Sequence, residues 1–425
     1  MRGAKIQSRK KISINEVIEL KKPEYVYIPL ICGNDTDITV IPKIGDYVYK
    51  GSVIGNNKGH FKMFIHSSVS GKVTSIENKT YPTGKKVKCI VIENDFKEKL
   101  EEMKPAKEEI NDYTKEEFIE LIKMGGVVGM GGAGFPTYVK YDTDTKIKTL
   151  LVNATECEAF LTADYMLTKT RIREILEGID AIMEINDIDY CIICVQKHNR
   201  KLIKLINQYI GTYLNIKVAT VPNVYPIGYE RALIFVTIGI QYDKLPIEKS
   251  IVVNNISTIY AIYKVLKTGL PVLERIVTVS GMVKKPTNIL VKIGTPIKRI
   301  LEEIPLKGDN LVIVIDGPMM GRSLKDEDDC MVTKEMNAIL ALRPLKREET
   351  TCIRCGKCIQ HCPVRICPVL IKDAIHNVEK IKSLNPERCI SCGICSYICP
   401  ARIDLRNIVG DAKMAIREDD EDGTE

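Results

Sequence analysis

The sequence predicts a multidomain protein of mixed α/β and α+β architecture, and three observations support this fold class. Its 425 residues exceed the ~250–300 residues that one hydrophobic core usually organises. Short apolar runs broken by glycine and proline fill residues 25–93, whereas strand-length and helix-length apolar patterns alternate from residue 119 onward. Finally, nine of the 15 cysteines lie within residues 352–399, and eight of these nine form two runs of the same spacing.

The composition excludes some classes of function. Hydrophobic residues make up 45% and charged residues 28%, as in ordinary soluble proteins. No apolar run approaches the ~18 residues of a membrane span, and residues 232–240, among the longest, have the length of a buried strand. The first residues lack the apolar core of a secretory signal, so we expect cysteines used for metal or redox chemistry in a reducing compartment. The net charge is +7, but the basic residues are interleaved with acidic ones and Trp is absent. Both features argue against nucleic-acid binding.

Residues 1–95 are predicted to form an all-β N-terminal domain. The order of Gly45-Asp46 and residues 65–73 resembles the barrel-sandwich fold of biotinyl and lipoyl carriers. Those carriers present a lysine at a hairpin tip, and residues 69–71 offer none there, so the domain is interpreted as a scaffold. His66 is interpreted as a structural histidine with its hydrogen bonds satisfied.

A charge-dense linker is predicted over residues 96–118, and it ends in a helix start. Thr114 and Glu117 form a capping-box pattern, and the apolar residues 118, 121 and 122 then face inward. Gly125-Gly126 is predicted to end this helix.

The central domain, residues 119–262, contains a glycine-rich loop. Gly129, Gly131, Gly132 and Gly134 lie close together. Glycines this dense let backbone amides turn inward around a phosphate without interference from a Cβ atom. The loop fits the pattern G-x-G-x-x-G, but a helix precedes it and Pro136 follows it, unlike a dinucleotide-binding turn.

A predicted strand at residues 150–153 delivers Asn153, Glu156 and Glu158 to the carboxyl end of a sheet, where α/β folds place ligands. Apolar runs at residues 192–195 and 216–221 flank a helical pattern at 200–210, which is consistent with a βαβ unit. Cys191 and Cys194 have the spacing of a redox motif but lie in a strand-like run, so they are interpreted as inert core residues.

Residues 263–325 are predicted to form a further module of strands (275–281, 289–293 and 311–317) and one helix (296–304). It resembles a soluble-ligand-binding β-grasp (SLBB) module and is interpreted as a spacer or docking surface.

The C-terminal domain, residues 340–405, contains two copies of the run C-x2-C-x2-C-x3-C-P. In the bacterial two-cluster pattern the fourth cysteine of each run crosses to the other cluster. This predicts two [4Fe–4S] clusters, one on Cys352, Cys355, Cys358 and Cys399 and the other on Cys389, Cys392, Cys395 and Cys362. Zinc is disfavoured, because two complete runs closed by proline exceed the two Cys-x2-Cys pairs of a zinc site. A helix is expected over residues 370–381, and residues 406–425 are expected to be a frayed acidic tail.

The order of these motifs resembles a known family. The glycine loop, residues 153–158, residues 225–230 and residues 252–258 follow one another as in the flavin-binding subunit of respiratory NADH dehydrogenase. The chain looks closer still to the RnfC family, the C subunit of the Rnf electron-transport complex, which joins this flavoprotein core to an N-terminal barrel-sandwich domain and a C-terminal two-cluster module. Ala159 and Tyr229 depart from the family pattern near the NADH pocket.

The resemblance implies a Rossmann-like domain that binds FMN non-covalently and uses NAD(H). Glu156 and Glu158 would line the nicotinamide side as catalytic residues, and Lys140 would lie near the FMN phosphate. The residues implied to bind the two cofactors are Gly129, Gly131, Gly132, Gly134, Phe135, Lys140, Asn153, Gly228, Glu230, Asn254, Asn255 and Thr258.

The same resemblance implies an NADH-linked oxidoreductase component that exchanges electrons between NAD(H) and ferredoxin-type carriers. It would be peripheral, on the cytoplasmic side of the cell membrane, and docked on the other subunits of an ion-translocating complex. The alternative is a soluble NADH-dependent protein that feeds a substrate reductase such as proline reductase. A non-catalytic adaptor is disfavoured, because an adaptor needs neither the cysteine runs nor the glycine loop.

Overall fold

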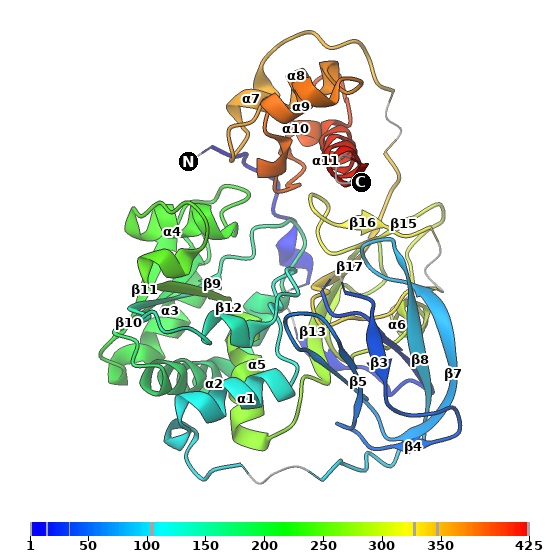
Figure 1. Ribbon diagram of the computed structural model, residues 1–425, viewed down its shortest axis with the longest axis vertical. Coiled ribbons are helices and arrows are strands. Elements are labelled where there is room, and N and C mark those ends of the chain that lie inside the picture. Colours follow the sequence, from blue (N-terminus) through cyan, green and yellow to red (C-terminus); the bar gives the residue numbers. More distant parts are fainter. Residues whose placement is uncertain are drawn as a thin grey trace.

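The computed structural model describes residues 2–13, 16–33, 35–102, 106–325, 329–345 and 348–422, with the backbone alone for residues 421 and 422. Figure 1 shows the blue N-terminal strands at the lower right, the green central domain at the left and the orange and red C-terminal helices above both. No helix in these described ranges is long and apolar enough to cross a membrane.

The N-terminal strands form two antiparallel sheets around one core. The strands are β2 (Tyr25–Pro29), β3 (Ile38–Val40), β4 (Tyr47–Val48), β5 (Val53–Asn57), β6 (Phe64–His66), β7 (Gly71–Thr80) and β8 (Lys86–Asn94). One sheet has the order β2-β8-β7-β4 and the other β3-β5-β6. Apolar residues that alternate along the strands, among them Val26, Ile54 and Ile92, fill the space between the sheets. This arrangement agrees with the predicted barrel sandwich.

The helix α1 (Lys115–Met124) begins at the predicted capping box. The Thr114 hydroxyl accepts a hydrogen bond from the amide of Glu117 at 3.2 Å, and the Glu117 carboxylate accepts one from the amide of Thr114 at 2.9 Å. Gly125 ends the helix, so the glycine loop follows a fixed element.

The central domain is built on a parallel sheet with the order β11-β10-β9-β12. Its strands are β9 (Thr149–Ala154), β10 (Tyr190–Gln196), β11 (Ile216–Val221) and β12 (Ile251–Asn255). The helices α2 (Ala163–Ile185), α3 (Arg200–Tyr209) and α5 (Ile256–Thr268) share a core with one face of this sheet. The helix α4 (Glu230–Ile238) packs on the other face. Cys191 and Cys194 are buried on opposite faces, as predicted for core residues.

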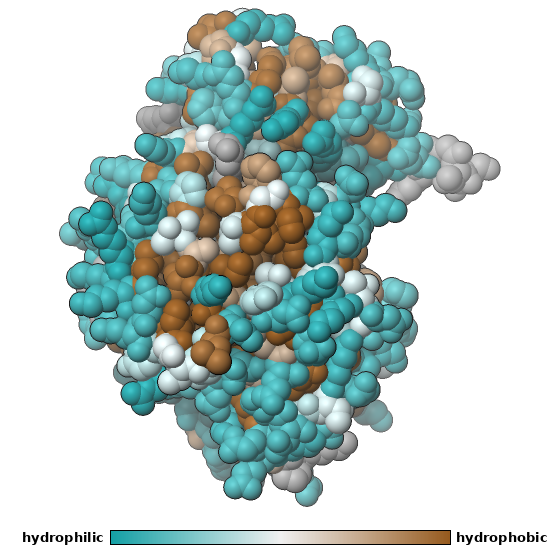
Figure 2. All heavy atoms as spheres, turned by 90° about the vertical axis from the view of Figure 1, so that its left-hand side faces the viewer, coloured by the Kyte–Doolittle hydropathy of each residue, from teal (hydrophilic) through white to brown (hydrophobic). Residues whose placement is uncertain are grey.

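Of the apolar run at residues 232–240, residues 232–238 lie in helix α4, which Gly239 caps, and do not form the strand that the length of the run suggested. A short run of apolar residues has no polar positions from which a period of two or of 3.6 could be read. Leu233 and Ile234 are buried, whereas Phe235 is exposed. Figure 2 shows apolar side chains gathered on the side of the molecule that lies at the left in Figure 1, where α4 is found.

A mixed six-stranded sheet lies between the other parts. Its strands are β1 (Val17–Glu19), β13 (Glu274–Gly281), β14 (Thr287–Lys292), β15 (Val312–Ile315), β16 (Arg322–Ser323) and β17 (Ala338–Leu342). Their order is β1-β14-β13-β17-β15-β16, so this sheet takes strands from both sides of residues 263–325. The helix α6 (Ile297–Glu303) begins after Pro296, as predicted, and packs on the sheet.

The C-terminal domain consists of short helices and one long one. They are α7 (Lys357–Gln360), α8 (Pro368–Asp373), α9 (Val378–Ser383), α10 (Ile394–Tyr397) and α11 (Leu405–Asp422). The single helix predicted over residues 370–381 is wrong, because the Asn377 side chain accepts a hydrogen bond from the Lys380 amide at 2.9 Å and so starts a new helix, α9. The predicted frayed tail is also wrong as far as Asp422, because α11 continues to that residue. There Lys382 pairs with Asp419 at 2.7 Å and with Asp420 at 2.8 Å.

Candidate functional site

The glycine loop lies at the carboxyl ends of the two strands that also carry the predicted asparagines. Asn153 lies near the end of β9 beside Asn255 of β12, and the two residues are paired in register. Parallel strands bring such residues together because all carboxyl ends point to the same edge of the sheet. The structure therefore brings these predicted residues to one edge.

The loop itself presents bare backbone toward this edge. The Met130 amide donates a hydrogen bond to the Thr258 hydroxyl at 2.9 Å, and the Gly134 amide donates one to the Gly129 carbonyl at 3.0 Å. A Cβ atom on Gly131 would lie 3.1 Å from Cβ of Asn255, so a side chain there would crowd the asparagine. Gly132 has a φ of 108°, which favours glycine. Such a loop fits a phosphate-bearing ligand that approaches the main chain closely.

Lys140 is a partly buried cation shortly after the loop in the sequence. Its Nζ atom donates a hydrogen bond to the carbonyl oxygen of Val253 at 2.6 Å, and none of the described carboxylates forms an ion pair with it. Burial lowers the pKa of Lys140, and the nearby Glu230 carboxylate opposes that shift. An anionic group would therefore stabilise the charged lysine, which fits the predicted role at the FMN phosphate.

Hydrogen bonds fix the remaining predicted residues around the edge of the sheet. The Asn153 side chain donates to the Gly228 carbonyl at 3.0 Å and accepts from the Thr155 hydroxyl at 2.7 Å. The carboxylate of Glu230 accepts a hydrogen bond from the Tyr242 hydroxyl at 2.9 Å. The Asn254 amide donates to the Tyr141 hydroxyl, so Asn254 is turned into the core.

The two predicted catalytic glutamates are partly buried and have different partners. Glu156 forms an ion pair with Lys10 at 3.7 Å and accepts a hydrogen bond from the Asp164 amide at 3.0 Å. Glu158 accepts hydrogen bonds from the amides of Met319 and Met320 at 3.2 and 2.8 Å. Burial raises the pKa of both carboxyl groups to about 7. Both side chains can therefore gain or lose a proton near neutral pH.

Several residues of this site were missed by sequence reasoning. Lys10 comes from the N-terminal segment, and Asp164 binds the side chains of Asn255 at 2.7 Å and Ser257 at 2.6 Å. Arg275, from the six-stranded sheet, donates a hydrogen bond to the Met130 carbonyl of the glycine loop. No local motif marks these residues, because they reach the site only through long-range packing.

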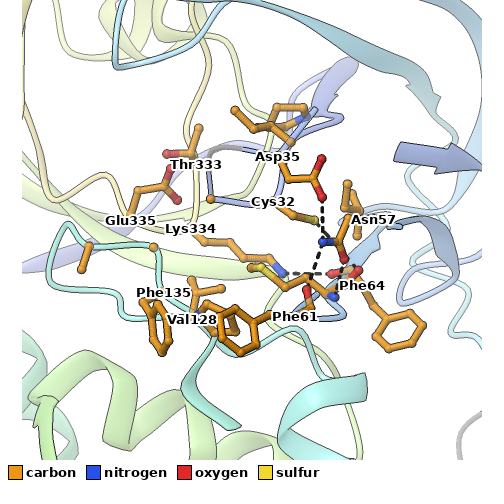
Figure 3. A pocket seen from close by; sticks show the side chains of 18 of the residues that line it. Cys32, Asp35, Asn57, Phe61, Phe64, Val128, Phe135, Thr333, Lys334 and Glu335 are labelled. Atoms are coloured by element: carbon orange, nitrogen blue, oxygen red, sulfur yellow. Dashed lines mark hydrogen bonds between the residues drawn. The ribbon is translucent and has the colours of Figure 1, made fainter. Parts of the chain in front are cut away.

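A cavity of about 460 Å³ lies on the outer side of the glycine loop. Gly132, Gly134 and Phe135 form one wall, and the barrel-sandwich domain forms another. The rings of Phe61 and Phe135 meet edge to face, with centroids 5.8 Å apart. Figure 3 shows these two rings beside each other, with Lys334 extending across the cavity. The cavity is therefore lined by two aromatic rings and a partly buried lysine.

Some polar atoms in this cavity have no hydrogen-bond partner among the described residues. The Nζ atom of Lys334 donates to the carbonyl of Gly126 at 2.8 Å, and burial lowers its pKa to about 8. Nδ1 of His66 and the hydroxyl of Thr333 have no hydrogen-bond partner among the described residues. His66 is buried, as expected of a structural histidine, but its ring lines the cavity and its Nδ1 atom meets no partner among the described residues. A polar ligand would supply the missing hydrogen bonds.

The cysteines group as the crossover pattern predicts. Cys362 lies close enough to Cys389, Cys392 and Cys395 to raise the pKa of each thiol, although burial is the largest cause of the three shifts. Cys352, Cys399 and also Cys395 pack against the apolar cluster that contains Cys358. Equivalent glycines, Gly356 and Gly393, share a φ of 74° and cap α7 and α10.

The cysteine side chains of the described part of the chain do not converge on a position for a single metal ion. No group of three or more His, Cys, Asp or Glu side chains within the described ranges is close enough to hold one metal ion. The four thiolates of a cubane each bind a different iron, so they need not converge on one point.

The two cysteine groups differ in their surroundings. The Tyr225 hydroxyl of the central domain donates a hydrogen bond to the Cys392 carbonyl at 2.7 Å. A Cβ atom on Gly393 would lie 2.5 Å from the carbonyl oxygen of Met319, whereas one on Gly356 would meet nothing within 4 Å. Cys355 is exposed and Cys392 is buried. The Cys392 group therefore abuts the central domain, and the Cys355 group faces outward.

Family models match three parts of the chain. Residues 1–97 match the RnfC barrel sandwich hybrid domain, residues 122–264 the Nuo51 FMN-binding domain, and residues 344–400 the 4Fe-4S dicluster domain. The chain is also 32% identical over 380 residues to the C subunit of the proton-translocating ferredoxin:NAD(+) oxidoreductase complex of Clostridium ljungdahlii, and the match covers 87% of this chain and 82% of that one. The chain belongs to the RnfC family.

Other members of the RnfC family show similar identity. The C subunit of the Na(+)-translocating ferredoxin:NAD(+) oxidoreductase complex of Acetobacterium woodii is 32% identical over 83% of this chain and 82% of its own length. The C subunit of the ion-translocating oxidoreductase complex of Vibrio cholerae is 32% identical over 83% of this chain, but the match spans only 47% of that longer protein. A NAD+-reducing [NiFe]-hydrogenase structure has a TM-score of 0.51 over 73% of this chain and 62% of its own, at 15% identity, which indicates a shared fold alone.

The family models confirm the predicted cofactors. Like other RnfC proteins, this chain has an FMN-binding domain and a domain for two [4Fe–4S] clusters. The bare glycine loop, the unpaired Lys140 and the grouped cysteines described above fit these cofactors.

Proposed function

We propose that this chain exchanges electrons between NAD(H) and ferredoxin-type carriers through FMN and two [4Fe–4S] clusters, as the peripheral RnfC component of an ion-translocating complex. The observation that carries the proposal is the contact between the flavin domain and the cluster domain. Tyr225, near the glycine-loop edge of the sheet, donates its hydroxyl hydrogen bond to the backbone of the cluster cysteine Cys392.

Bound FMN would accept a hydride as an electron pair and release the electrons singly. The glycine loop, Asn153, Asn255 and Thr258 would hold it, and Lys140 would balance its phosphate charge. Glu156 and Glu158 would line the nicotinamide side. Since the pKa of each carboxyl group lies at about 7, either could take up the proton that accompanies oxidation of the reduced cofactor.

The different surroundings of the two clusters support an order of electron transfer. The cluster on Cys362, Cys389, Cys392 and Cys395 would exchange electrons with the flavin, since this group abuts Tyr225 and Met319. The cluster that includes Cys355 would exchange electrons with the external carrier, since this cysteine is exposed.

The aromatic cavity supports a position for the adenylate half of NAD(H). The adenine would lie against Phe61 and Phe135, and Lys334 would face a phosphate. The glycine loop separates this cavity from the edge of the sheet by backbone without bulky side chains. One dinucleotide could therefore lie across the loop with its nicotinamide at the flavin.

Reduced nicotinamide mononucleotide, which lacks the adenylate, tests this position. Phe61→Ala should raise KM for NADH about tenfold, because stacking a base on an aromatic ring is worth about 1–3 kcal/mol. The same variant should leave the rate with reduced nicotinamide mononucleotide unchanged. Phe96→Ala, which removes another exposed phenylalanine near the N-terminal domain, is the matched control. An unchanged KM for NADH in Phe61→Ala would remove the adenylate from this cavity.

The module at residues 263–325 is proposed to be an SLBB-type β-grasp that docks on other subunits.

The chain is proposed to lie on the cytoplasmic side of the membrane. All 15 cysteines are free of disulfides, as in a reducing compartment. The curated relatives are named as subunits of such complexes, which favours this function over a soluble protein that feeds a substrate reductase.

Two measurements test the function as a whole. NADH should bleach the flavin and then the clusters of the anaerobically purified protein. The protein should also sediment with membranes at low salt and be partly released at high salt, because salt screens charge contacts to lipids and acidic subunits. A flavin that NADH never bleaches contradicts the NAD(H) link. Co-purification with a soluble substrate reductase in place of membrane subunits favours the alternative.

A further inference from the structure

Arg275 is a buried cation directly beneath the glycine loop. It lies on β13, and the residue is 3% exposed. The guanidinium donates hydrogen bonds to four uncharged oxygens: the carbonyls of Met130 and Ile276, each at 3.4 Å, the side chain of Asn337 at 2.9 Å and the carbonyl of Lys334. It therefore ties the glycine loop to the segment at residues 334–337.

The charge of Arg275 is not cancelled by a direct ion pair. Burial lowers its pKa to about 10, and the carboxylates of Asp164 and Asp316 oppose that shift from a distance. No described carboxylate forms an ion pair with the guanidinium, and both aspartates are engaged elsewhere. Asp164 holds Asn255 and Ser257, and Asp316 accepts a hydrogen bond from the Asn337 amide at 2.6 Å. The positive charge of Arg275 therefore acts electrostatically on the glycine loop.

The contacts of Arg275 continue to both predicted redox sites. Asn337, its acceptor, is bonded through its own amide to Asp316. The residues after Asp316 bind Glu158 through the amides of Met319 and Met320. Arg406 of the cluster domain donates to the carbonyls of the same two methionines, at 3.0 and 2.7 Å. One connected set of contacts thus joins the glycine loop, Glu158 and the cluster domain.

We propose that Arg275 is a positioning residue of the flavin site: it holds the glycine loop in place and keeps an unpaired positive charge beneath it. The inference rests on the proposed function, because it takes FMN as the occupant of the loop. The charge stabilises the added negative charge of reduced FMN relative to oxidised FMN, and so sets the flavin potential. The six-stranded sheet then tunes the flavin and is more than a spacer.

Two variants separate the charge from the contacts. Arg275→Gln should weaken FMN binding at least tenfold and make the flavin midpoint potential more negative. A tenfold loss of the preference for reduced FMN corresponds to about 30 mV for a two-electron couple. Arg275→Lys keeps the charge, so it should retain a potential close to that of the wild type even where FMN binds less tightly.

A third variant changes the charge while Arg275 stays in place. Asn337→Asp puts a carboxylate beside the guanidinium, so it should shift the flavin potential in the same negative direction with FMN retained. Arg299→Gln is the matched control, because Arg299 lies on α6 of the same module and pairs with Glu302 and Glu303. It should change neither FMN content nor potential.

The measurements are released FMN per chain and a dye-equilibrated redox titration, with the cluster EPR signals as an internal control. Wild-type flavin potentials in both Arg275→Gln and Asn337→Asp, with FMN bound, would overturn the inference. If Arg275→Gln fails to fold, as lost cluster signals would show, Asn337→Asp decides alone. A wild-type protein with intact clusters and no FMN would instead overturn the proposed function on which the inference rests.

Discussion

The contact between the flavin and cluster domains can be tested with two equivalent glycines. Gly356 and Gly393 occupy the same place in the two cysteine runs and share a φ of 74°. Replacing either by alanine therefore adds the same backbone cost, roughly 1–2 kcal/mol for the left-handed conformation. Any further difference between the free-energy costs of Gly356→Ala and Gly393→Ala comes from the surroundings of the added methyl group.

Those surroundings differ sharply. A methyl group on Gly393 would lie 2.5 Å from the Met319 carbonyl oxygen, whereas one on Gly356 would enter open space. Overpacking of this kind costs typically about 1–3 kcal/mol. If the domains separate to relieve it, the ratio of docked to undocked states falls roughly 5- to 150-fold.

The assay is stopped-flow reduction by NADH, with flavin and cluster absorbance followed separately. In Gly393→Ala, NADH should reduce the flavin at the normal rate and the clusters at least tenfold more slowly. In Gly356→Ala, both rates should be normal. Cluster content and thermal unfolding establish that both variants are folded. Equal cluster reduction rates in the two variants would refute the assignment of the Cys392 group as the cluster next to the flavin.

Three further predictions follow from the site. Cys399→Ser should damage the cluster built on Cys352 and spare the one on Cys389, which EPR of the reduced protein distinguishes; loss of the Cys389 cluster alone would disprove the crossover. Gly132→Val should empty the flavin site and leave the clusters, because a branched residue is strained at a φ of 108°; FMN released by acid at wild-type yield would contradict this. Glu158→Gln should flatten the pH dependence of stability. Burial raises the pKa of Glu158 from 4.5 to about 7 in the folded state, so that state binds the proton more tightly than the unfolded one. The contribution of this carboxyl group to stability is therefore fully present below the unfolded pKa and is lost as the pH rises through about 7. Thermal unfolding at several pH values in this window should show a smaller decline for the variant than for the wild type, and equal declines would count against the buried carboxyl.

Much of the site can be predicted because its parts are local in sequence. Three ligands of each cluster lie within seven residues, and the loop that presents them is fixed by that spacing and by Gly356 or Gly393. The glycine loop likewise carries its own conformational signal. The pairing of Asn153 with Asn255 is not predicted, because it depends on β12 lying beside β9 in the sheet.

Helix and strand boundaries are predicted less evenly. Thr114 and Glu117 define the start of α1, because a capping box is a local interaction within one helical turn. The length of residues 232–240 suggests a strand, because apolar residues on every side of α4 give no period. Asn377 splits a predicted helix through one side-chain hydrogen bond, which the apolar pattern does not record.

The cofactor set can be inferred without coordinates, since the cysteine runs specify two clusters and the family resemblance of the glycine loop and the segments after it implies FMN. The surroundings of those cofactors depend on how the modules pack. Lys10 reaches Glu156, Arg275 reaches the glycine loop, and Arg406 reaches the loop that binds Glu158, each from a different module. A buried charge needs partners wherever the packed modules supply them, and this requirement leaves no periodic or local trace in the chain.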